Sequence, residues 1–240
     1  MKLSRLFDAL AAKASSDSAA VLDRDYLWSY QELATLVDEF DEQIGRQYLP
    51  PGCRVAILAR NSVETIALML AIGRMGHAVL AVSPGLGGDI RETIYDSNAI
   101  FCELSAKLSD RHAKLERAKY LNEALLEGCH AKAPDCALML TTSGSTGIPK
   151  VVALSEAGID AFISWSSRHF GIGAESRVLN YSPLNFDLTL LEVWAPLAVG
   201  ASTIICNPDK IADGRYLLSL INKAQPHIVQ AVPCSTAFCA

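Results

Sequence analysis

The 240-residue sequence has no hydrophobic run long enough to cross a membrane. The stretch "IALMLAIG" comes nearest with eight residues, whereas a membrane helix needs about 20. At the amino terminus, Asp8 interrupts the apolar residues that follow Lys2 and Arg5, which favours an amphipathic helix over a signal peptide. We therefore expect a soluble cytoplasmic protein without a membrane partner.

A clustered basic face and a cysteine framework are also missing. The 21 Lys and Arg residues are interspersed with 26 Asp and Glu residues, which does not suit a nucleic-acid surface. The seven cysteines are odd in number, and none forms a C-x-x-C pair, so neither a disulfide framework nor a zinc site is expected. We find no internal repeat, and half of the residues are apolar, which is typical of a globular domain with a real core.

What the sequence does have is a regular alternation of strand-like and helix-like segments. "AAVLD" and "YLWSY" predict a small hairpin. Apolar residues at helical spacing follow, preceded by Ser29 and Glu32 in the pattern of a capping box. "RVAILA", "VETIALMLAIGRMG" with Asn61 and Glu64 as its caps, and "HAVLAVSP" form a strand–helix–strand unit, which predicts two parallel strands.

Further along the chain the alternation continues. Strands are predicted at "IFCEL", "CALMLTT", "VVALS", "SRVLNYSP", "ASTIICN" and "PHIVQAVP", and helices at "GGDIRETIYDSNA", "SEAGIDAFISWSSRHF", "FDLTLLEVWAPLAVG" and "DGRYLLSLINKAQ". The more polar residues 104–134 are expected to form a peripheral helix or loop. The sequence thus predicts an α/β fold of layered, mostly parallel sheets with flanking helices.

The stretch "TTSGSTGIPKVV", Thr141 to Val152, carries the strongest chemical signal. Hydroxyls and backbone N–H groups of such a turn can all point at one anion, glycines let the backbone approach closely, and Lys150 adds a positive charge. The spacing is not that of a Walker A loop, because Pro149 stands where the second glycine belongs. An ordinary hydrophilic loop is the alternative that the residues alone leave open.

"TTSGSTGIPK" closely resembles the phosphate loop of the adenylate-forming enzymes, which include acyl- and aryl-CoA synthetases, luciferases and the adenylation domains of nonribosomal peptide synthetases. In that family the loop reads Thr-Ser-Gly-Thr/Ser-Thr-Gly-x-Pro-Lys-Gly, and here Val151 replaces the last glycine. "WSYQELA", "MLAIGRMGHAVLAVSP", "NFDLTLLEVWAPLAVGAST" and "PHIVQAVP" resemble further family segments, so the resemblance covers nearly the whole chain.

The resemblance implies that the chain is part of the amino-terminal domain of the adenylate-forming fold and uses ATP and Mg²⁺. It implies that one set of loop residues binds the ATP phosphates. Within this loop set, Lys150 would order the loop and Thr142 is a candidate ligand of the metal. That loop set is Thr142, Ser143, Gly144, Ser145, Thr146, Gly147 and Lys150.

"NFDLT" narrows the expected substrate. In amino-acid-activating members of the family a Phe-Asp pair at this point binds the substrate's α-ammonium group, and Asp187 matches it. Leu188 and Leu191, one helical turn apart, would line an apolar pocket that suits a small amino acid, for which proline is our hypothesis. The alternative is that Asp187 only caps the following helix.

The family's later motifs for adenine, ribose, the hinge and the catalytic lysine are absent from the sequence. We therefore expect residues 1–240 to be the amino-terminal portion of an adenylation domain, truncated before the small carboxy-terminal domain, with no catalytic residue of its own and no activity alone. Expected partners are a carboxylate substrate, a carrier protein and the missing carboxy-terminal part. Two alternatives stay open: a fragment of an acyl- or aryl-CoA ligase, and a noncatalytic half-domain that binds a partner.

Overall fold

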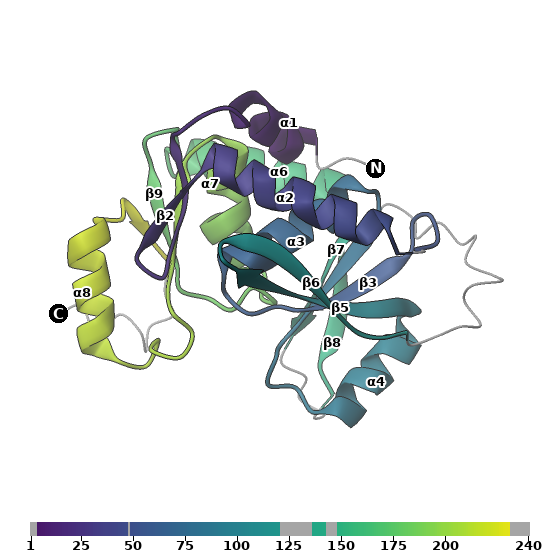
Figure 1. Ribbon diagram of the computed structural model, residues 1–240. Coiled ribbons are helices and arrows are strands. Elements are labelled where there is room, and N and C mark those ends of the chain that lie inside the picture. The colour runs from purple at the N-terminus through teal and green to yellow at the C-terminus, as the bar shows by residue number, and fades with distance from the viewer. Residues whose placement is uncertain (1–3, 48, 121–135, 143–147, 231–240) are drawn as a thin grey trace. The chain divides into compact units, whose positions relative to one another are not determined.

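The computed structural model describes residues 4–47, 49–120, 136–142 and 148–230. They form two compact units, each described here by itself. The first unit comprises Thr35–Arg60 and Glu64–Ile159, and the second comprises Ser4–Ala34, Asn61–Val63 and the chain from Asp160 onward. Each unit contains one β-sheet (Figure 1).

The sheet of the first unit has six strands in the order β6-β5-β3-β4-β7-β8. The four central strands β5, β3, β4 and β7 run parallel, as the sequence predicts, and β6 and β8 pair antiparallel at the two edges. The strands are β3 (Arg54–Leu58), β4 (Ala78–Val82), β5 (Ile100–Ser109), β6 (His112–Tyr120), β7 (Cys136–Thr142) and β8 (Lys150–Ser155). The unbroken apolar runs in β4 and β7 fit strands that are covered on both faces.

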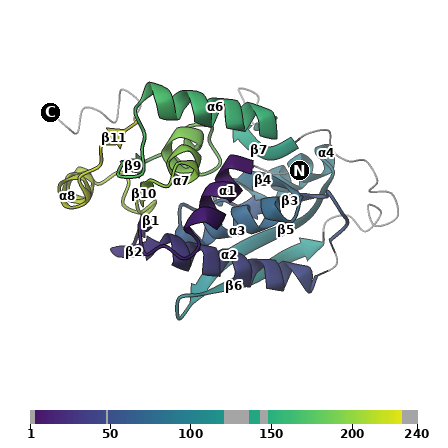
Figure 2. The same cartoon turned by 90° about the horizontal axis from the view of Figure 1, so that it is seen from above.

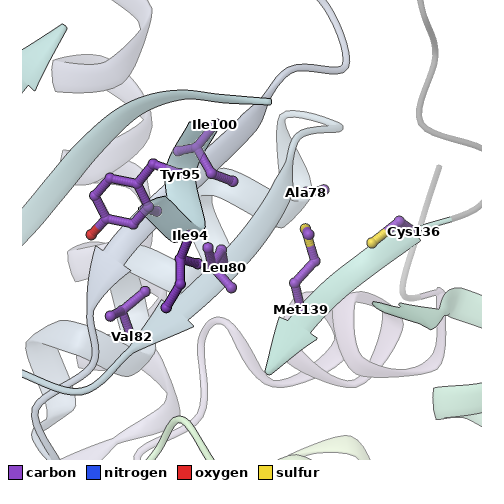
Figure 3. Packing of buried hydrophobic residues seen from close by; sticks show 9 residues of the cluster. Ala78, Leu80, Val82, Ile94, Tyr95, Ile100, Cys136 and Met139 are labelled. Carbon is purple, nitrogen blue, oxygen red and sulfur yellow. The ribbon is translucent and has the colours of Figure 1, made fainter. Parts of the chain in front are cut away.

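Helices flank this sheet, and α4 (Gly88–Ser97) lies against one face of it. Ile94 and Tyr95 of α4 pack with Leu80, Val82 and Met139 of the strands in one buried cluster (Figure 3). The other helices that contribute residues to this unit are α2 (Tyr30–Gly45), α3 (Val63–Arg74) and α6 (Glu156–His169). The apolar spacing in the sequence therefore predicted both layers of this unit.

The expectation of a peripheral helix or loop at residues 104–134 is wrong for its described part. β5 continues to Ser109, and β6 returns beside it as the second strand of a hairpin. Asp110 and Arg111 both have left-handed backbone torsions, with φ of 50° and 68°, as a tight two-residue hairpin turn requires. The hairpin could not be predicted from the sequence, because Asp-Arg is not one of the usual residue pairs for that turn. Residues 121–134 lie outside the described residues.

The β5–β6 hairpin lies beside α2, as Figure 2 shows, and α2 supplies its polar partners. Gln43 donates to the Ala113 carbonyl at 2.8 Å and accepts from the Leu115 N–H at 2.8 Å. Glu39 accepts from the Ala113 N–H at 2.6 Å and contacts His112 at 2.6 Å. Side chains of α2 thus form hydrogen bonds with backbone groups of the edge strand β6.

The second unit has a five-stranded sheet in the order β11-β9-β10-β1-β2. β1 (Ala19–Asp23) and β2 (Tyr26–Ser29) form the predicted antiparallel hairpin, while β10 (Ser202–Ile205), β9 (Arg177–Asn180) and β11 (Ile228–Val229) pair in parallel. Helix α8 (Gly214–Ala224), yellow in Figure 1, packs Leu217 onto Leu179 and Ile204. Helix α1 (Ser4–Lys13) completes the unit. The last part of the strand predicted at "PHIVQAVP" lies beyond residue 230, outside the described residues.

Two predicted helix starts have different outcomes. The capping box is confirmed, because the Ser29 N–H donates to Glu32 at 2.8 Å and the Glu32 N–H donates to the Ser29 hydroxyl at 3.1 Å. Asn61 does not cap α3: the Val63 N–H at the start of that helix donates to the Asp23 carboxylate at 3.0 Å instead. Asn61 bonds to a turn far along the chain, which local pattern matching cannot detect.

The predicted apolar helix that ends at Gly200 is only partly confirmed. A turn precedes a π-helical segment, η1 (Leu190–Trp194), which runs into the short helix α7 (Ala195–Ala198). Pro196 gives the reason, because it has no N–H to donate to the Glu192 carbonyl four residues back. That carbonyl accepts from the Thr203 hydroxyl at 2.6 Å, and the Ala195 N–H reaches back five residues to Leu190.

Candidate functional site

The predicted phosphate loop joins β7 to β8. Thr141 pairs with Val151 and Thr142 with Lys150 across these antiparallel strands, so residues 143–149 close a hairpin. Ser143, Gly144, Ser145, Thr146 and Gly147 lie outside the described residues. The flanking residues Thr142 and Lys150 are both exposed, and the Thr142 hydroxyl donates to the Lys150 carbonyl at 3.4 Å.

The strand that leads to the loop ends at a favourable edge of the sheet in the first unit. β4 and β7 are parallel neighbours, so Thr142 at the end of β7 and Ser83 directly after β4 lie at the same carboxyl edge. Open parallel sheets bind their ligands at that edge. Val151, which replaces the family's last loop glycine, packs against the buried cluster below. The substitution therefore adds an apolar contact at the base of the hairpin.

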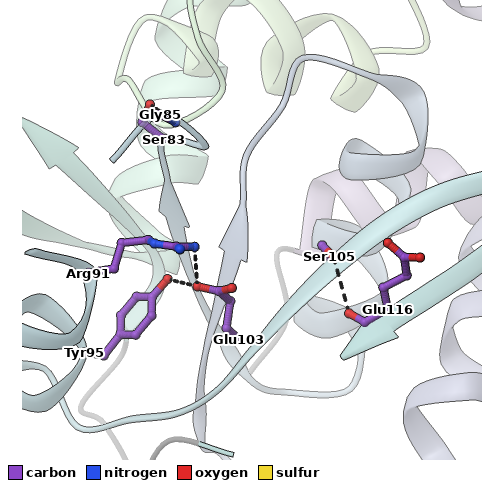
Figure 4. Close-up of polar contacts among 7 residues, drawn as sticks. All are labelled: Ser83, Gly85, Arg91, Tyr95, Glu103, Ser105 and Glu116. Carbon is purple, nitrogen blue, oxygen red and sulfur yellow. Dashed lines mark hydrogen bonds and ion pairs between the residues drawn. The ribbon is translucent and has the colours of Figure 1, made fainter. Parts of the chain in front are cut away.

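Other polar side chains of the first unit bond to one another. Glu103 of β5 accepts from Arg91 at 3.0 Å and from the hydroxyl of Tyr95 (Figure 4). Burial and the adjacent Glu103 carboxylate raise the pKa of Tyr95 above its usual range. The three side chains fasten α4 to the sheet, and we assign them a structural role.

The predicted substrate residues lie close together in the sequence of the second unit: Asp187 and Leu188 in the turn between β9 and η1, and Leu191 in η1 itself. Asp187 is exposed, Leu188 is half-buried and Leu191 is buried. The Leu191 N–H donates to the Leu188 carbonyl three residues back at 3.1 Å, so the two leucines lie at the two ends of one tight turn. No residue that the structure describes hydrogen-bonds to the Asp187 carboxylate; only the backbone carbonyl of Asp187 takes part in the helix start, accepting from Leu190 at 3.0 Å.

Glu192 lies directly after these residues and was missed by the sequence reasoning. It is fully buried. Its carboxylate accepts from the Ser182 N–H at 2.9 Å, the Ser182 hydroxyl at 2.9 Å and the Asn180 amide at 2.8 Å. Burial raises the pKa of Glu192 to about 7, and these hydrogen bonds oppose the rise. A lone acidic residue inside the apolar run "LTLLEVWAPL" was the available signal.

The candidate residues thus fall into two groups, one in each unit. Thr142 and Lys150 belong to the first unit, and Asp187, Leu188 and Leu191 belong to the second. Within the described ranges, no three His, Cys, Asp or Glu side chains form a metal-binding group. Cys53, Cys102, Cys136 and Cys206 are buried, and none of them forms a disulfide within the described part of the chain. None of the helices in the described part of the chain has the length and apolar character of a membrane span.

Comparison with known proteins adds a family and a fold. A family model described as "AMP-binding enzyme" matches residues 7–237. The chain is 30% identical to the L-proline–[L-prolyl-carrier protein] ligase of Pseudomonas fluorescens over 89% of its own length and 47% of the relative's. It is 28% identical to tyrocidine synthase 3 of Brevibacillus parabrevis over 96% of its length and 4% of that protein. The chain therefore spans about half of the first relative and a small part of the second.

Solved structures agree on the fold. The AMPPNP-bound nonribosomal peptide synthetase FmoA3 superposes with a TM-score of 0.80 at 21% identity, over 99% of this chain and 26% of that one. The N-terminal subdomain of Klebsiella oxytoca NpsA, in complex with 3-hydroxybenzoyl-AMSN, superposes with a TM-score of 0.74 at 22% identity, over 95% of this chain and 59% of that one. At these identities the likeness establishes the architecture alone.

Proposed function

Since the chain belongs to the family of AMP-binding enzymes, we propose that residues 1–240 are the amino-terminal portion of an enzyme that activates an amino acid with ATP. In this reaction a carboxylate oxygen of the amino acid attacks the α-phosphorus of ATP. The bond from that phosphorus to the β-phosphate oxygen breaks, and pyrophosphate leaves with the electron pair. Such chemistry depends mainly on positioning and on neutralising charge.

The phosphate-binding role is proposed for the β7–β8 hairpin. Thr142, Ser143, Gly144, Ser145, Thr146 and Gly147 would hold the β- and γ-phosphates, and the exposed Lys150 at the foot of the hairpin would order the loop. The Thr142 hydroxyl is an oxygen ligand of the type that Mg²⁺ accepts. The ion would neutralise charge on the departing pyrophosphate.

Asp187 is the observation that carries the choice of an amino acid. Its carboxylate is exposed and finds no hydrogen-bonding partner among the described side chains. An exposed carboxylate without such a partner is suited to binding an ammonium group. Leu188 and Leu191 add apolar surface beside it, which fits a small aliphatic or cyclic side chain. The name of the Pseudomonas fluorescens relative supports proline as the substrate and a carrier protein as the acceptor.

The test is amino-acid-dependent exchange of labelled pyrophosphate into ATP by the complete gene product. We expect exchange with a small apolar amino acid, strongest with proline. Asp187→Ala should lower kcat/KM for the amino acid by about 100-fold, since a charge-assisted contact is worth roughly 1.5–3 kcal/mol. Glu175→Gln, which alters another exposed carboxylate of the same unit, is the matched control and should leave exchange unchanged.

Two results would redirect the assignment. Activation of acyl or aryl acids that is insensitive to Asp187→Ala would favour a CoA ligase. Failure to bind ATP or any carboxylate would favour a noncatalytic module. Exchange by the isolated 240 residues would contradict our expectation that this portion is inactive alone.

A further inference from the structure

The turn between β9 and η1 has buried ends and an exposed middle. Ser182, Leu184 and Thr189 are buried, whereas Phe186 and Asp187 are exposed. No described side chain holds the Asp187 carboxylate itself. The position of Asp187 is therefore set by whatever holds the rest of this turn.

Glu192 holds the turn from its carboxyl-terminal side. One carboxylate oxygen, Oε2, accepts from both the Ser182 N–H and the Asn180 side-chain amide, and the other, Oε1, accepts from the Ser182 hydroxyl. No Lys, Arg or His in the described ranges pairs with Glu192. A fully buried carboxylate without a cation is costly, and here the hydrogen bonds from Asn180 and Ser182 offset that cost and tie the turn to η1.

Asn61 holds the same turn from another part of the chain. Its side-chain carbonyl accepts from the Leu184 N–H at 3.0 Å, and its amide donates to the Ser182 carbonyl at 2.8 Å and to the Asn180 side chain at 3.1 Å. Asn61 is buried and belongs to the second unit, like the turn itself. Two buried side chains from distant segments thus bind successive backbone groups of one short turn.

Bonds inside the turn carry this constraint to Asp187. The Phe186 N–H donates to the Pro183 carbonyl at 3.0 Å, and the Thr189 hydroxyl donates to the Phe186 carbonyl at 2.7 Å. With Ser182 and Leu184 fixed, the backbone that leads to Asp187 has little freedom. An ion pair with a small substrate depends on such fixing, because misplacement by about 1 Å can cost 100-fold in rate.

We propose that Glu192 and Asn61 are positioning residues of the amino-acid site, which clamp the turn between β9 and η1 and so set where Asp187 presents its carboxylate. This inference rests on the proposed function. Neither residue touches the substrate, and their contribution is the geometry of Asp187.

The experiment measures KM for the amino acid and KM for ATP in pyrophosphate exchange by the complete gene product. Glu192→Leu removes all the acceptors and should raise KM for the amino acid by about tenfold or more, with KM for ATP within about twofold. Asn61→Ala should also raise KM for the amino acid, and it provides the test if Glu192→Leu does not fold. Glu192→Gln should stay near wild type, because its carbonyl can accept from Ser182 and Asn180 while its amide donates to the Ser182 hydroxyl.

Thr203→Val is the matched control. It removes a buried hydrogen bond to the Glu192 backbone but leaves the carboxylate and the turn alone. It should lower stability without changing KM for the amino acid. Unchanged KM in both folded Glu192→Leu and folded Asn61→Ala would overturn the inference.

A second readout separates this inference from the proposed function. If the wild-type protein activates no amino acid, the proposed function fails, and amide hydrogen exchange at Ser182 and Leu184 decides the matter. Faster exchange in Glu192→Leu and Asn61→Ala, but not in Thr203→Val, upholds the clamp. Equal exchange in all variants overturns it.

Discussion

At the residue scale, two carboxylates five positions apart experience opposite environments. Asp187 is exposed, and Glu192 is fully buried. Their difference follows from the chain itself: Asp187 lies in the turn, whereas Glu192 lies on η1 with three hydrogen-bond donors around it. The Asp187 carboxylate is therefore available to a ligand, whereas the Glu192 carboxylate holds part of the fold.

The pH dependence of stability should reveal the buried carboxylate. The pKa of Glu192 rises from 4.5 to about 7 on folding because of burial, so between these values the native state keeps a proton that the unfolded state has lost. The stabilisation is full below pH 4.5, and about 3 kcal/mol of it is lost as pH rises through 7. Urea unfolding of the complete gene product at a series of pH values measures it.

Glu192→Gln is the control for this measurement, because its amide does not titrate. The variant should lack this part of the pH dependence. If wild type and variant lose stability in parallel between pH 4.5 and 7.5, the carboxylate is already ionised in the folded protein and the assignment is wrong.

At the element scale, the sequence predicted those elements whose signals are local. The capping box at Ser29 and Glu32 and the apolar spacing of the helices fix starts and faces within a few residues. Features set by distant contacts were not predicted. Asn61 bonds to Leu184 rather than capping α3, and the β5–β6 hairpin takes its hydrogen-bond partners from α2. In the π-helical segment η1, the Glu192 carbonyl takes its partner from Thr203 of β10.

The β5–β6 hairpin offers a test of that long-range support. Gln43→Ala should free the Leu115 N–H and the Ala113 carbonyl, which lose their bonds to the Gln43 side chain. We expect a loss of about 1–2 kcal/mol of local stability, measured as faster amide exchange at Leu115.

Glu42→Ala is the comparison on the same helix. Among the described residues its side chain pairs with Arg46 alone, and both side chains are exposed, so its loss should change stability by less than about 0.5 kcal/mol. Equal amide exchange at Leu115 in both variants would show that Gln43 does not hold the hairpin.

At the scale of the whole molecule, the candidate residues divide between two units with their own sheets. Both groups were proposed from contiguous strings, "TTSGSTGIPK" and "NFDLT", through their resemblance to family segments, and their roles stay predictions. The sequence could not predict the buried hydrogen bonds that join Asn61 to Asn180 and Ser182, about 120 positions away. Under the proposed function, the first unit would bind ATP and the second unit would bind the amino acid.

Kinetics of the complete gene product can test this division of labour. Lys150→Met, in the first unit, should raise KM for ATP by about tenfold and leave KM for the amino acid within about twofold, because it removes a charge from the phosphate loop alone. Asp187→Asn, in the second unit, should do the reverse. Since the two side chains share no partner among the described residues, their effects on the free energy of activation should add within about 0.5 kcal/mol in the double variant. Strong coupling between the substitutions, or a rise in both KM values from either one alone, would mean that the loop and the turn act on the same substrate.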